Sequence, residues 1–386
     1  MAQQLQLEKI MKGYDWIGHV PNEIYWDPSG ETVYFKWNPE NVSADSLYKV
    51  SLQNHSPKKV NALERKLSPS SRIVFDRSFT KITYVKNGDL FYRDLKTESK
   101  IQFTNTVDRI SSPVFNTNGE SIIYSQNDNL FELQISSGTI TQLTYMIKGT
   151  APKDGSEPTD PAEKWLYRDQ LKLSQILNER QQKKEASKEW KEIDAPKRPL
   201  KIYLENKRVS HLQISPDLNF ITYRLTTEVE NVSSQIPTYV TNSGFTENIN
   251  ARAKVGTSKS TYELGIYDRA RDTTYLFNTK SIPGITDQID YPNQNWIKGE
   301  KERPVLIQGP VWSDDGSHAL IQIRSLDNKD RWLMTLNMAT GEPSLIDRQQ
   351  DPAWIKGPGM GYIFSSPAMG WMLDNENIWF QSETSG

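Results

Sequence analysis

Six segments of the chain repeat one pattern of apolar and polar positions. Each segment starts at an apolar anchor residue that is followed by a short polar turn, and seven residues after the anchor a run of β-branched, aromatic and aliphatic residues begins. The ninth residue after each anchor is bulky, as expected if it packs against a neighbouring repeat. The pattern predicts six β-hairpins. The anchors are Trp26, Phe75, Phe115, Ile214, Trp312 and Trp371. The ninth positions are Phe35, Tyr84, Tyr124, Tyr223, Ile321 and Phe380.

Five of the hairpins are followed by a third strand-like segment, and most of these by a polar turn and a fourth. "DLKTESKIQFT" and "MATGEPSLI" show the turn and fourth strand. The third strands are expected at residues 47–50, 90–95, 130–135, 264–268 and 332–337. Four antiparallel strands recurring in one register predict an all-β fold, a β-propeller of four-stranded antiparallel blades. An antiparallel sandwich is the alternative.

The sixth repeat begins at Trp371 and has room for only two strands before Gly386. Half a blade would leave an open sheet edge. Residues 1–386 are therefore expected to be a partial propeller domain, a segment of a longer protein.

Extra residues are expected to gather on one face of the blades. Residues 226–261 are predicted as a long linker between the second and third strands of the fourth repeat. The largest insertion, residues 145–209, lies between the third and fourth repeats and is predicted to contain a loop and one helix that starts near Pro161. Its apolar stripe would either dock the helix onto the sheets or serve as a lid or docking arm for a partner domain. The stripe consists of Trp165, Leu166, Leu173, Ile176 and Leu177.

The amino-acid composition limits the kinds of partner and chemistry that we expect for the chain. With 46 Lys and Arg against 48 Asp and Glu, the net charge is −2, so we expect no nucleic-acid partner. No apolar run reaches the roughly 18 residues of a membrane span, so no span is predicted. The chain has no cysteine, which excludes disulfides and thiolate chemistry and leaves the compartment open.

A search for catalytic and metal motifs finds little. Gly-x-Ser-x-Gly is absent, and the nearest stretch, residues 256–260, lies in a polar loop. The glycines of residues 356–362 lack a following helix, and Asp314 with Asp315 are expected to shape a blade turn. We predict no catalytic residue, metal site or cofactor in this chain. The four histidines lie at no metal-ligand spacing; they are His19, His55, His211 and His318.

The chain resembles the N-terminal propeller of the prolyl oligopeptidase family of serine peptidases, and within it the dipeptidyl peptidase IV type. The resemblance rests on "WDPSGETVYF", "FNTNGESIIYSQNDNLFEL", "ISPDLNFITYR", "WSDDGSHALIQIRSLDNKDRWLMTLNMATGE" and "WMLDNENIWFQSETSG", in this order. It implies a peptide substrate, a catalytic α/β-hydrolase domain of the same polypeptide, and a propeller that gates access by size. It also implies a periplasmic or secreted protein.

One departure from the family concerns substrate binding. In dipeptidyl peptidases a Trp-x-Tyr-Glu-Glu-like segment of the insertion holds the free amine of the substrate with two carboxylates. The matching residues here, which are the candidate site, are Trp165, Tyr167, Arg168 and Asp169. Arg168 places a positive charge where a carboxylate is expected, so the resemblance leaves open whether the parent protein releases dipeptides. Exposed helix residues without a binding role are the alternative.

Two functions follow from these observations. The first is a non-catalytic, substrate-gating propeller portion of an exported serine peptidase. The second is a stand-alone propeller that binds a protein or glycan of the cell envelope. A second copy of the chain, in a homodimer, is a further candidate partner.

Overall fold

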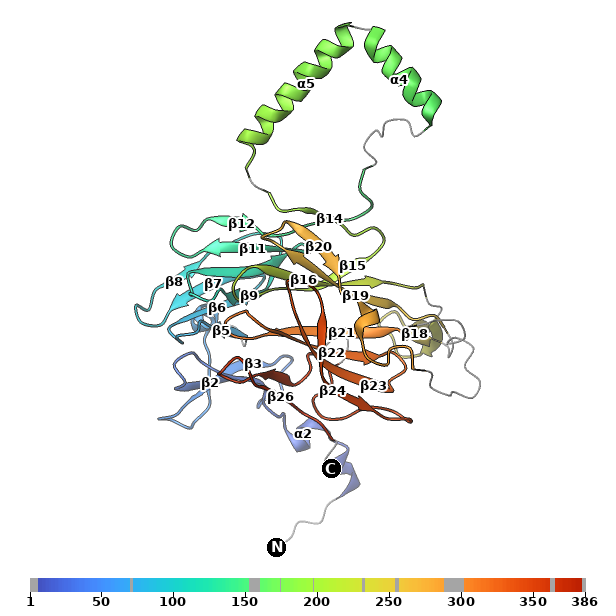
Figure 1. The fold of residues 1–386 in the computed structure, drawn as a ribbon. Coiled ribbons are helices and arrows are strands. Elements are labelled where there is room, and N and C mark those ends of the chain that lie inside the picture. Colours follow the sequence, from blue (N-terminus) through green and yellow to red (C-terminus); the bar gives the residue numbers. More distant parts are fainter. Residues whose placement is uncertain are drawn as a thin grey trace. The chain divides into compact units, whose positions relative to one another are not determined.

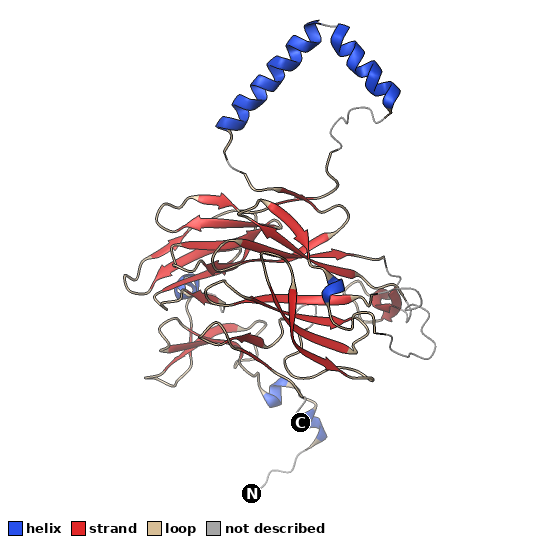
Figure 2. Ribbon diagram, in the orientation of Figure 1, coloured by secondary structure: helices blue, strands red, loops and turns tan. Residues whose placement is uncertain are grey.

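The computed structural model describes residues 6–69, 72–152, 160–173, 175–196, 198–230, 233–253, 257–287, 302–361 and 365–383. The chain divides into two compact units, Met1–Thr141 and Gln142–Gly386, and each is described by itself. Both are built mainly from antiparallel strands (Figure 2). The prediction of an all-β fold with four-stranded antiparallel sheets is confirmed.

The first unit holds three four-stranded sheets, labelled in Figure 1. The first sheet contains β1 (Asn22–Trp26), β2 (Thr32–Trp37), β3 (Ser46–Ser51) and β4 (Lys58–Lys59). The second contains β5 (Ile73–Phe75), β6 (Lys81–Lys86), β7 (Asp89–Asp94) and β8 (Lys100–Gln102). The third contains β9 (Ile110–Phe115), β10 (Ser121–Gln126), β11 (Asn129–Gln134) and β12 (Ile140–Gln142). Short helices are α1 (Leu7–Ile10), α2 (Tyr14–Ile17) and α3 (Ala62–Leu67).

The second unit holds two four-stranded sheets and three strand pairs. One sheet contains β15 (Arg208–Ile214), β16 (Phe220–Thr227), β19 (Thr261–Asp268) and β20 (Thr273–Leu276). The other contains β21 (Val305–Trp312), β22 (Ala319–Ser325), β23 (Asp330–Leu336) and β24 (Pro343–Gln350). The pairs are β13 (Tyr145–Ile147) with β14 (Lys201–Tyr203), β17 (Ser233–Thr238) with β18 (Glu247–Ala253), and β25 (Met369–Trp371) with β26 (Ile378–Phe380). The helices are α4 (Pro161–Leu173), α5 (Gln175–Asp194) and the 3₁₀ turn η1 (Thr279–Ser281).

The six predicted hairpins are confirmed in register. Every anchor is the last residue of the first strand, and it pairs with the residue seven positions later: Trp26 with Val33 and Trp312 with Ala319 are examples. The other four pairs are Phe75 with Ile82, Phe115 with Ile122, Ile214 with Ile221, and Trp371 with Ile378. A constant pairing offset means that one turn geometry recurs in all six hairpins.

Side-chain hydrogen bonds explain the recurring turn. In five hairpins the side-chain oxygen one residue after the anchor accepts the backbone N–H six residues after the anchor, as when Asp76 accepts from Lys81 at 2.7 Å and Ser313 from His318 at 2.9 Å. The fourth residue after the anchor has a left-handed backbone in all six, a conformation that favours glycine. These residues are Gly30, Phe79, Gly119, Leu218, Gly316 and Asn375.

A second irregularity recurs three residues before the anchor. Four first strands carry a β-bulge there, with a positive φ at Glu23, Ser112, His211 and Gly309. A bulge of this kind bends the strand and re-aims its side chains. It therefore gives the first strand of several repeats a local kink at an equivalent position.

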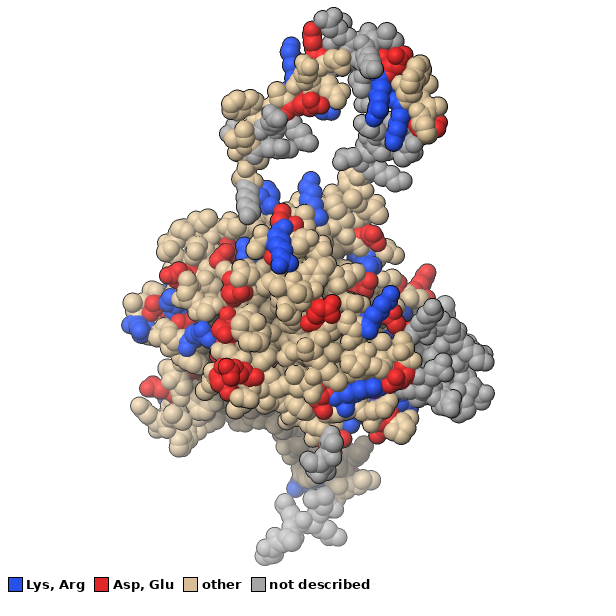
Figure 3. Space-filling model, viewed as in Figure 1, with Lys and Arg blue, Asp and Glu red and all other residues tan. Residues whose placement is uncertain are grey.

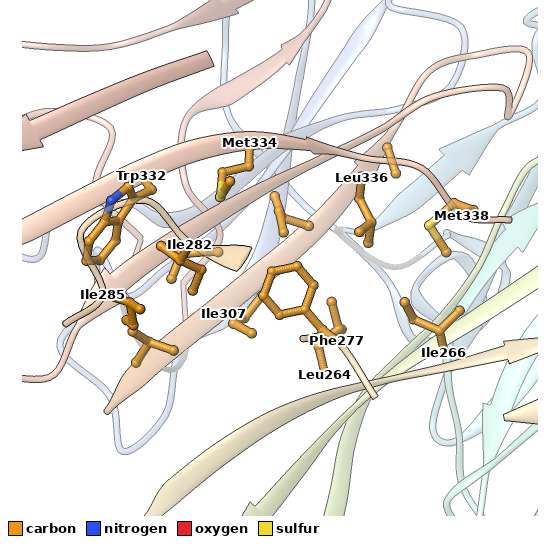
Figure 4. Packing of buried hydrophobic residues seen from close by; sticks show 14 residues of the cluster. Leu264, Ile266, Phe277, Ile282, Ile285, Ile307, Trp332, Met334, Leu336 and Met338 are labelled. Carbon is orange, nitrogen blue, oxygen red and sulfur yellow. The ribbon is translucent and has the colours of Figure 1, made fainter. Parts of the chain in front are cut away.

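The core of the second unit lies between its two four-stranded sheets (Figure 4). Leu264 and Ile266 of β19 meet Ile321 of β22 and Trp332 of β23 in one buried cluster. The other face of the second sheet packs through Leu320 and Leu333 against Met369 and its neighbours in β25–β26. The expected packing of the ninth position against a neighbouring repeat is thus confirmed for Ile321.

The first unit shows the same arrangement. Tyr124 of β10, at another ninth position, is buried with Tyr92 of the preceding sheet and with Ile122 and Leu133 of its own. Stacked sheets with alternating inward residues account for these clusters.

The two long insertions hold helices and a strand pair of the second unit. The helix expected near Pro161 corresponds to the helical segments α4 and α5, and residue 174 between them lies outside the described residues. The long linker expected over residues 226–261 is confirmed, since it joins β16 to β19, and it contains the β17–β18 hairpin, which the sequence pattern does not predict. The expected docking of the stripe onto the sheets fails for Trp165 and Leu166, which are 67% and 53% exposed. Helical periodicity predicts an apolar face but not the surface that covers it.

Candidate functional site

Helix α4 carries the candidate residues taken from the sequence. Trp165 and Arg168 are exposed, Asp169 is half-buried, and the side chain of Tyr167 lies outside the described residues. Residues three and four apart share a helix face, so Trp165 lies on the same side of α4 as Arg168 and Asp169. The helix thus presents an indole, a guanidinium and a carboxylate together.

The structure brings other residues together in a cavity of the second unit, with a volume of about 80 Å³. It lies where the bulge of β15 faces the bulge of β21 and the segment Ser365–Pro367. Its polar lining comes from His211, Gln213, Arg224, Gln308, Ser365 and Ser366. Two recurring bulges from successive repeats therefore build one recess.

The bulges depend on the residues that occupy them. His211 has φ +53°, and histidine is one of the residue types that tolerate this region. At the equivalent place Gly309 has φ +102°, and a Cβ there would lie 2.9 Å from the carbonyl oxygen of Leu320. A side chain at residue 309 would therefore be strained against the backbone of β22, so glycine maintains the bulge at this wall of the cavity.

Arg224 supplies the positive charge of the cavity. It is 6% exposed, and its Nη2 donates to Nδ1 of His211 at 2.7 Å, with Nε2 at 3.1 Å. Its guanidinium carbon lies 5.8 Å from the ring centre of Tyr262. Burial lowers the pKa of Arg224 from its ordinary value. The group stays charged at neutral pH, because arginine is not deprotonated in proteins.

His211 is the neutral partner in this pair. Although the residue lies at the exposed rim, the packing of protein around its ring lowers its pKa from 6.5, and the charges of Arg224 and Arg208 lower it further. A neutral imidazole nitrogen can accept the hydrogen bond that Arg224 donates. The cavity therefore carries about one positive charge near neutral pH.

A chain of buried side chains fixes the opposite wall. Arg331 Nε donates to Gln322 Oε1 at 2.8 Å, and Gln322 Nε2 donates to Gln308 Oε1 at 2.9 Å. Gln308 Nε2 in turn donates to the carbonyl oxygen of Ser365 at 2.9 Å. Buried, mutually satisfied polar groups hold one another in place. This relay orients the Gln308 amide and ties the Ser365 segment to the sheet.

The described residues were searched for groups of metal ligands and for helices that could span a membrane. That part of the chain contains no group of three or more His, Asp or Glu side chains arranged to hold a metal ion. None of its helices is both long and apolar enough to cross a membrane. Blue and red side chains are interspersed on the face shown in Figure 3, as expected from the net charge of −2.

The sequence did not point to the cavity. The spacing of the histidines gives His211 no role, and its partner Arg224 lies on the adjacent strand, where the sequence pattern carries no sign of the pair. One signal could have found the site, namely that His211 and Gly309 stand three residues before their anchors. Asp315 is placed as expected, since it shapes its turn by accepting from Ser313 and Ser317. Residues 256 and 362, in the two glycine-containing stretches, lie outside the described residues.

Comparisons with known proteins give likeness in structure only. No family model and no curated protein matches the chain. Dipeptidyl peptidase 4 of Porphyromonas gingivalis is similar at 14% identity with a TM-score of 0.44, covering 92% of this chain and 43% of that one. A putative dipeptidyl aminopeptidase IV of Bacteroides ovatus is similar at 11% identity with a TM-score of 0.39, covering 87% of this chain and 39% of that one. TolB of Acinetobacter baumannii is similar at 11% identity with a TM-score of 0.32, covering 86% of this chain and 57% of that one.

Such low identities and TM-scores carry no function to this chain. The chain spans less than half the length of either peptidase. Folds of this kind host unrelated activities, so function has to be argued from the sites.

Proposed function

We propose that this chain is the non-catalytic, substrate-gating propeller portion of an exported serine peptidase of the prolyl oligopeptidase family, of the dipeptidyl peptidase IV type. The Ser, Asp and His of catalysis then belong to an α/β-hydrolase domain of the same polypeptide, and the substrate is a peptide. The order of the family-like hairpins and the position of the insertion, between the third and fourth repeats, support this assignment.

The exposure of the family-like segment on α4 is the observation that carries the proposal. Trp165 is 67% exposed and Leu166 is 53% exposed, and Trp190 and Ile193 of α5 are exposed as well. Aromatic residues, tryptophan among them, are enriched at protein interfaces, so an exposed tryptophan on a helix is a candidate contact for a partner. The insertion is therefore available to a peptide or to the hydrolase domain.

The chemistry of α4 suits a weak amine site. The Asp169 carboxylate can pair with the ammonium group of a peptide N-terminus, and Trp165 offers an aromatic face on the same side of the helix. Arg168 opposes the ammonium group by like-charge repulsion. The native segment should thus bind free peptide amines less tightly than a segment with two carboxylates.

Reversing one charge tests this. In the Arg168→Glu variant, a tripeptide with a free amine should bind about tenfold more tightly than to the native chain, while its N-acetylated form is unaffected. Isothermal titration measures both affinities. Arg180→Glu, the same change on α5, is the matched control and should leave both affinities unchanged. Equal gains in the two variants, or equal gains for both peptides, would contradict the amine site.

The peptidase assignment has a separate test. Sequencing the coding region downstream of residue 386 should find further strands and then a Gly-x-Ser-x-Gly turn between a strand and a helix. A region without them would favour the stand-alone binding module. Residues 1–386 alone should hydrolyse no peptide substrate, and turnover by the purified chain would count against a non-catalytic role.

A further inference from the structure

The cavity between the β15 and β21 bulges is a binding site distinct from α4. We propose that it binds a single carboxylate group of a peptide, either its C-terminus or an Asp or Glu side chain, with Arg224 as the charged anchor. This inference does not rest on the peptidase assignment, because it comes from the lining of the cavity alone.

The charge of the lining favours an anion. Arg224 is 6% exposed, and no Asp or Glu is among the described residues that line the cavity. A buried guanidinium is less screened than a surface charge, so an anion that enters the recess interacts with it strongly. Hydrogen bonds from an arginine to a carboxylate are charge-assisted and stronger than those between neutral groups.

The number of charges favours a monoanion. Since His211 is neutral at physiological pH, the cavity offers one formal positive charge together with amides and hydroxyls. A carboxylate carries one negative charge, whereas a phosphate monoester carries nearly two. The site therefore matches a carboxylate better than a phosphate.

The size and shape of the recess favour the end of a longer molecule. A volume of about 80 Å³ is well above the minimum that one buried water molecule needs. The recess can therefore admit a small polar group such as a carboxylate. His211, Ser365 and Ser366 lie exposed at the rim, so the rest of the ligand can extend outward from it.

The walls are built before a ligand arrives. Gly309 holds the β21 bulge at a backbone conformation that other residues adopt poorly, and the Arg331–Gln322–Gln308 relay fixes the neighbouring Gln308 side chain. A pre-organised site loses less entropy on binding. Gln213, half-buried on β15, is a lining residue outside the buried core clusters.

Isothermal titration of the whole chain with N-acetylated peptides tests the proposal, because acetylation removes the amine that α4 would bind. N-acetyl-triglycine with a free carboxylate should bind, and its C-terminal amide should bind at least about tenfold more weakly. N-acetyl-glutamate amide, whose only carboxylate is in the side chain, separates the two sources. Equal affinity of acid and amide, no binding of any carboxylate, or tighter binding of inorganic phosphate would overturn the proposal.

Two variants assign the binding to the cavity. Arg224→Gln should weaken carboxylate binding about 10- to 100-fold. Gln213→Glu, which introduces a carboxylate of nearly the same shape, should weaken it to a similar degree and keeps the test valid if Arg224→Gln does not fold. The control is Arg252→Gln, which removes one charge from the exposed face of β18. Undiminished binding by Gln213→Glu, or an equal loss in the control, would overturn the assignment.

Discussion

The β21–β24 sheet and the α4–α5 helices use tryptophan in opposite ways. Trp332 of β23 is 0% exposed, and it donates to the carbonyl oxygen of Pro283 at 2.9 Å. The guanidinium carbons of Arg303 and Arg348 lie 5.4 and 5.6 Å from the centre of its ring. Trp165 of α4 is 67% exposed. The first side chain holds the fold together, and the second is free to serve recognition. The two residues are of the same type, and only their burial in the folded chain shows which one is structural and which one is available for recognition.

Replacing each of the two tryptophans by alanine should give the largest difference in stability between the sheet and the insertion. Trp332→Ala removes a fully buried side chain and should lower the free energy of unfolding by about 3–5 kcal/mol. Trp165→Ala should change it by no more than about 0.5 kcal/mol. Denaturant unfolding of both variants measures the difference. Similar losses in the two would mean that α4 is packed as tightly as the sheet.

Contact between strands of one sheet should give the next largest effect. Gly265 of β19 lies opposite Tyr223 of β16, and a Cβ at residue 265 would come within 2.2 Å of the tyrosine ring. Gly265→Ala should therefore cost about 1–3 kcal/mol of stability.

A second substitution tests whether that ring is the cause. In a Tyr223→Leu background, Gly265→Ala should cost at least about 0.5 kcal/mol less, as measured by the same unfolding experiment. A cost that is unchanged by Tyr223→Leu would place the constraint in the backbone of β19.

The contrast between sheet and insertion also explains what could be predicted from the sequence. The six hairpins, their register and their turns follow from local rules, because the anchor, the capping side chain such as Asp76 and the left-handed residue all lie within a few positions of one another. The β17–β18 hairpin has no such local signal. The cavity is harder still, since His211, Arg224 and Ser365 come from three segments that meet only in the folded unit.

Substitutions at the recurring left-handed turn position should change stability by a smaller amount. Phe79 and Gly119 occupy it in successive repeats of the first unit, with φ +54° and +66°. Phe79→Gly should raise stability by up to about 1 kcal/mol, because it relieves a conformation that costs side-chain-bearing residues about 1–2 kcal/mol.

The reverse change at the equivalent turn is the matched comparison. A Cβ at Gly119 would meet its nearest neighbours at an ordinary 3.6 Å, so Gly119→Ala should lose about 1 kcal/mol through backbone strain alone. Thermal unfolding of both variants checks the opposite signs. Changes of the same sign would show that the two turns are not equivalent.

The smallest effect is expected at the exposed turn of the β21–β22 hairpin, and it appears only in acid. Hydrogen bonds from Ser313 and from the amide and hydroxyl of Ser317 lower the pKa of Asp315 to about 2, against about 3.9 in an unfolded chain. Because the folded-state pKa is the lower one, the ionised carboxylate stabilises the fold above about pH 4, and this contribution is lost as the pH falls towards 2. Asp315→Asn should therefore flatten the dependence of stability on pH in that window. Ser317→Ala removes one donor side chain and should give an intermediate slope, and a slope identical to that of the native chain in both variants would rule out this turn as a source of acid sensitivity.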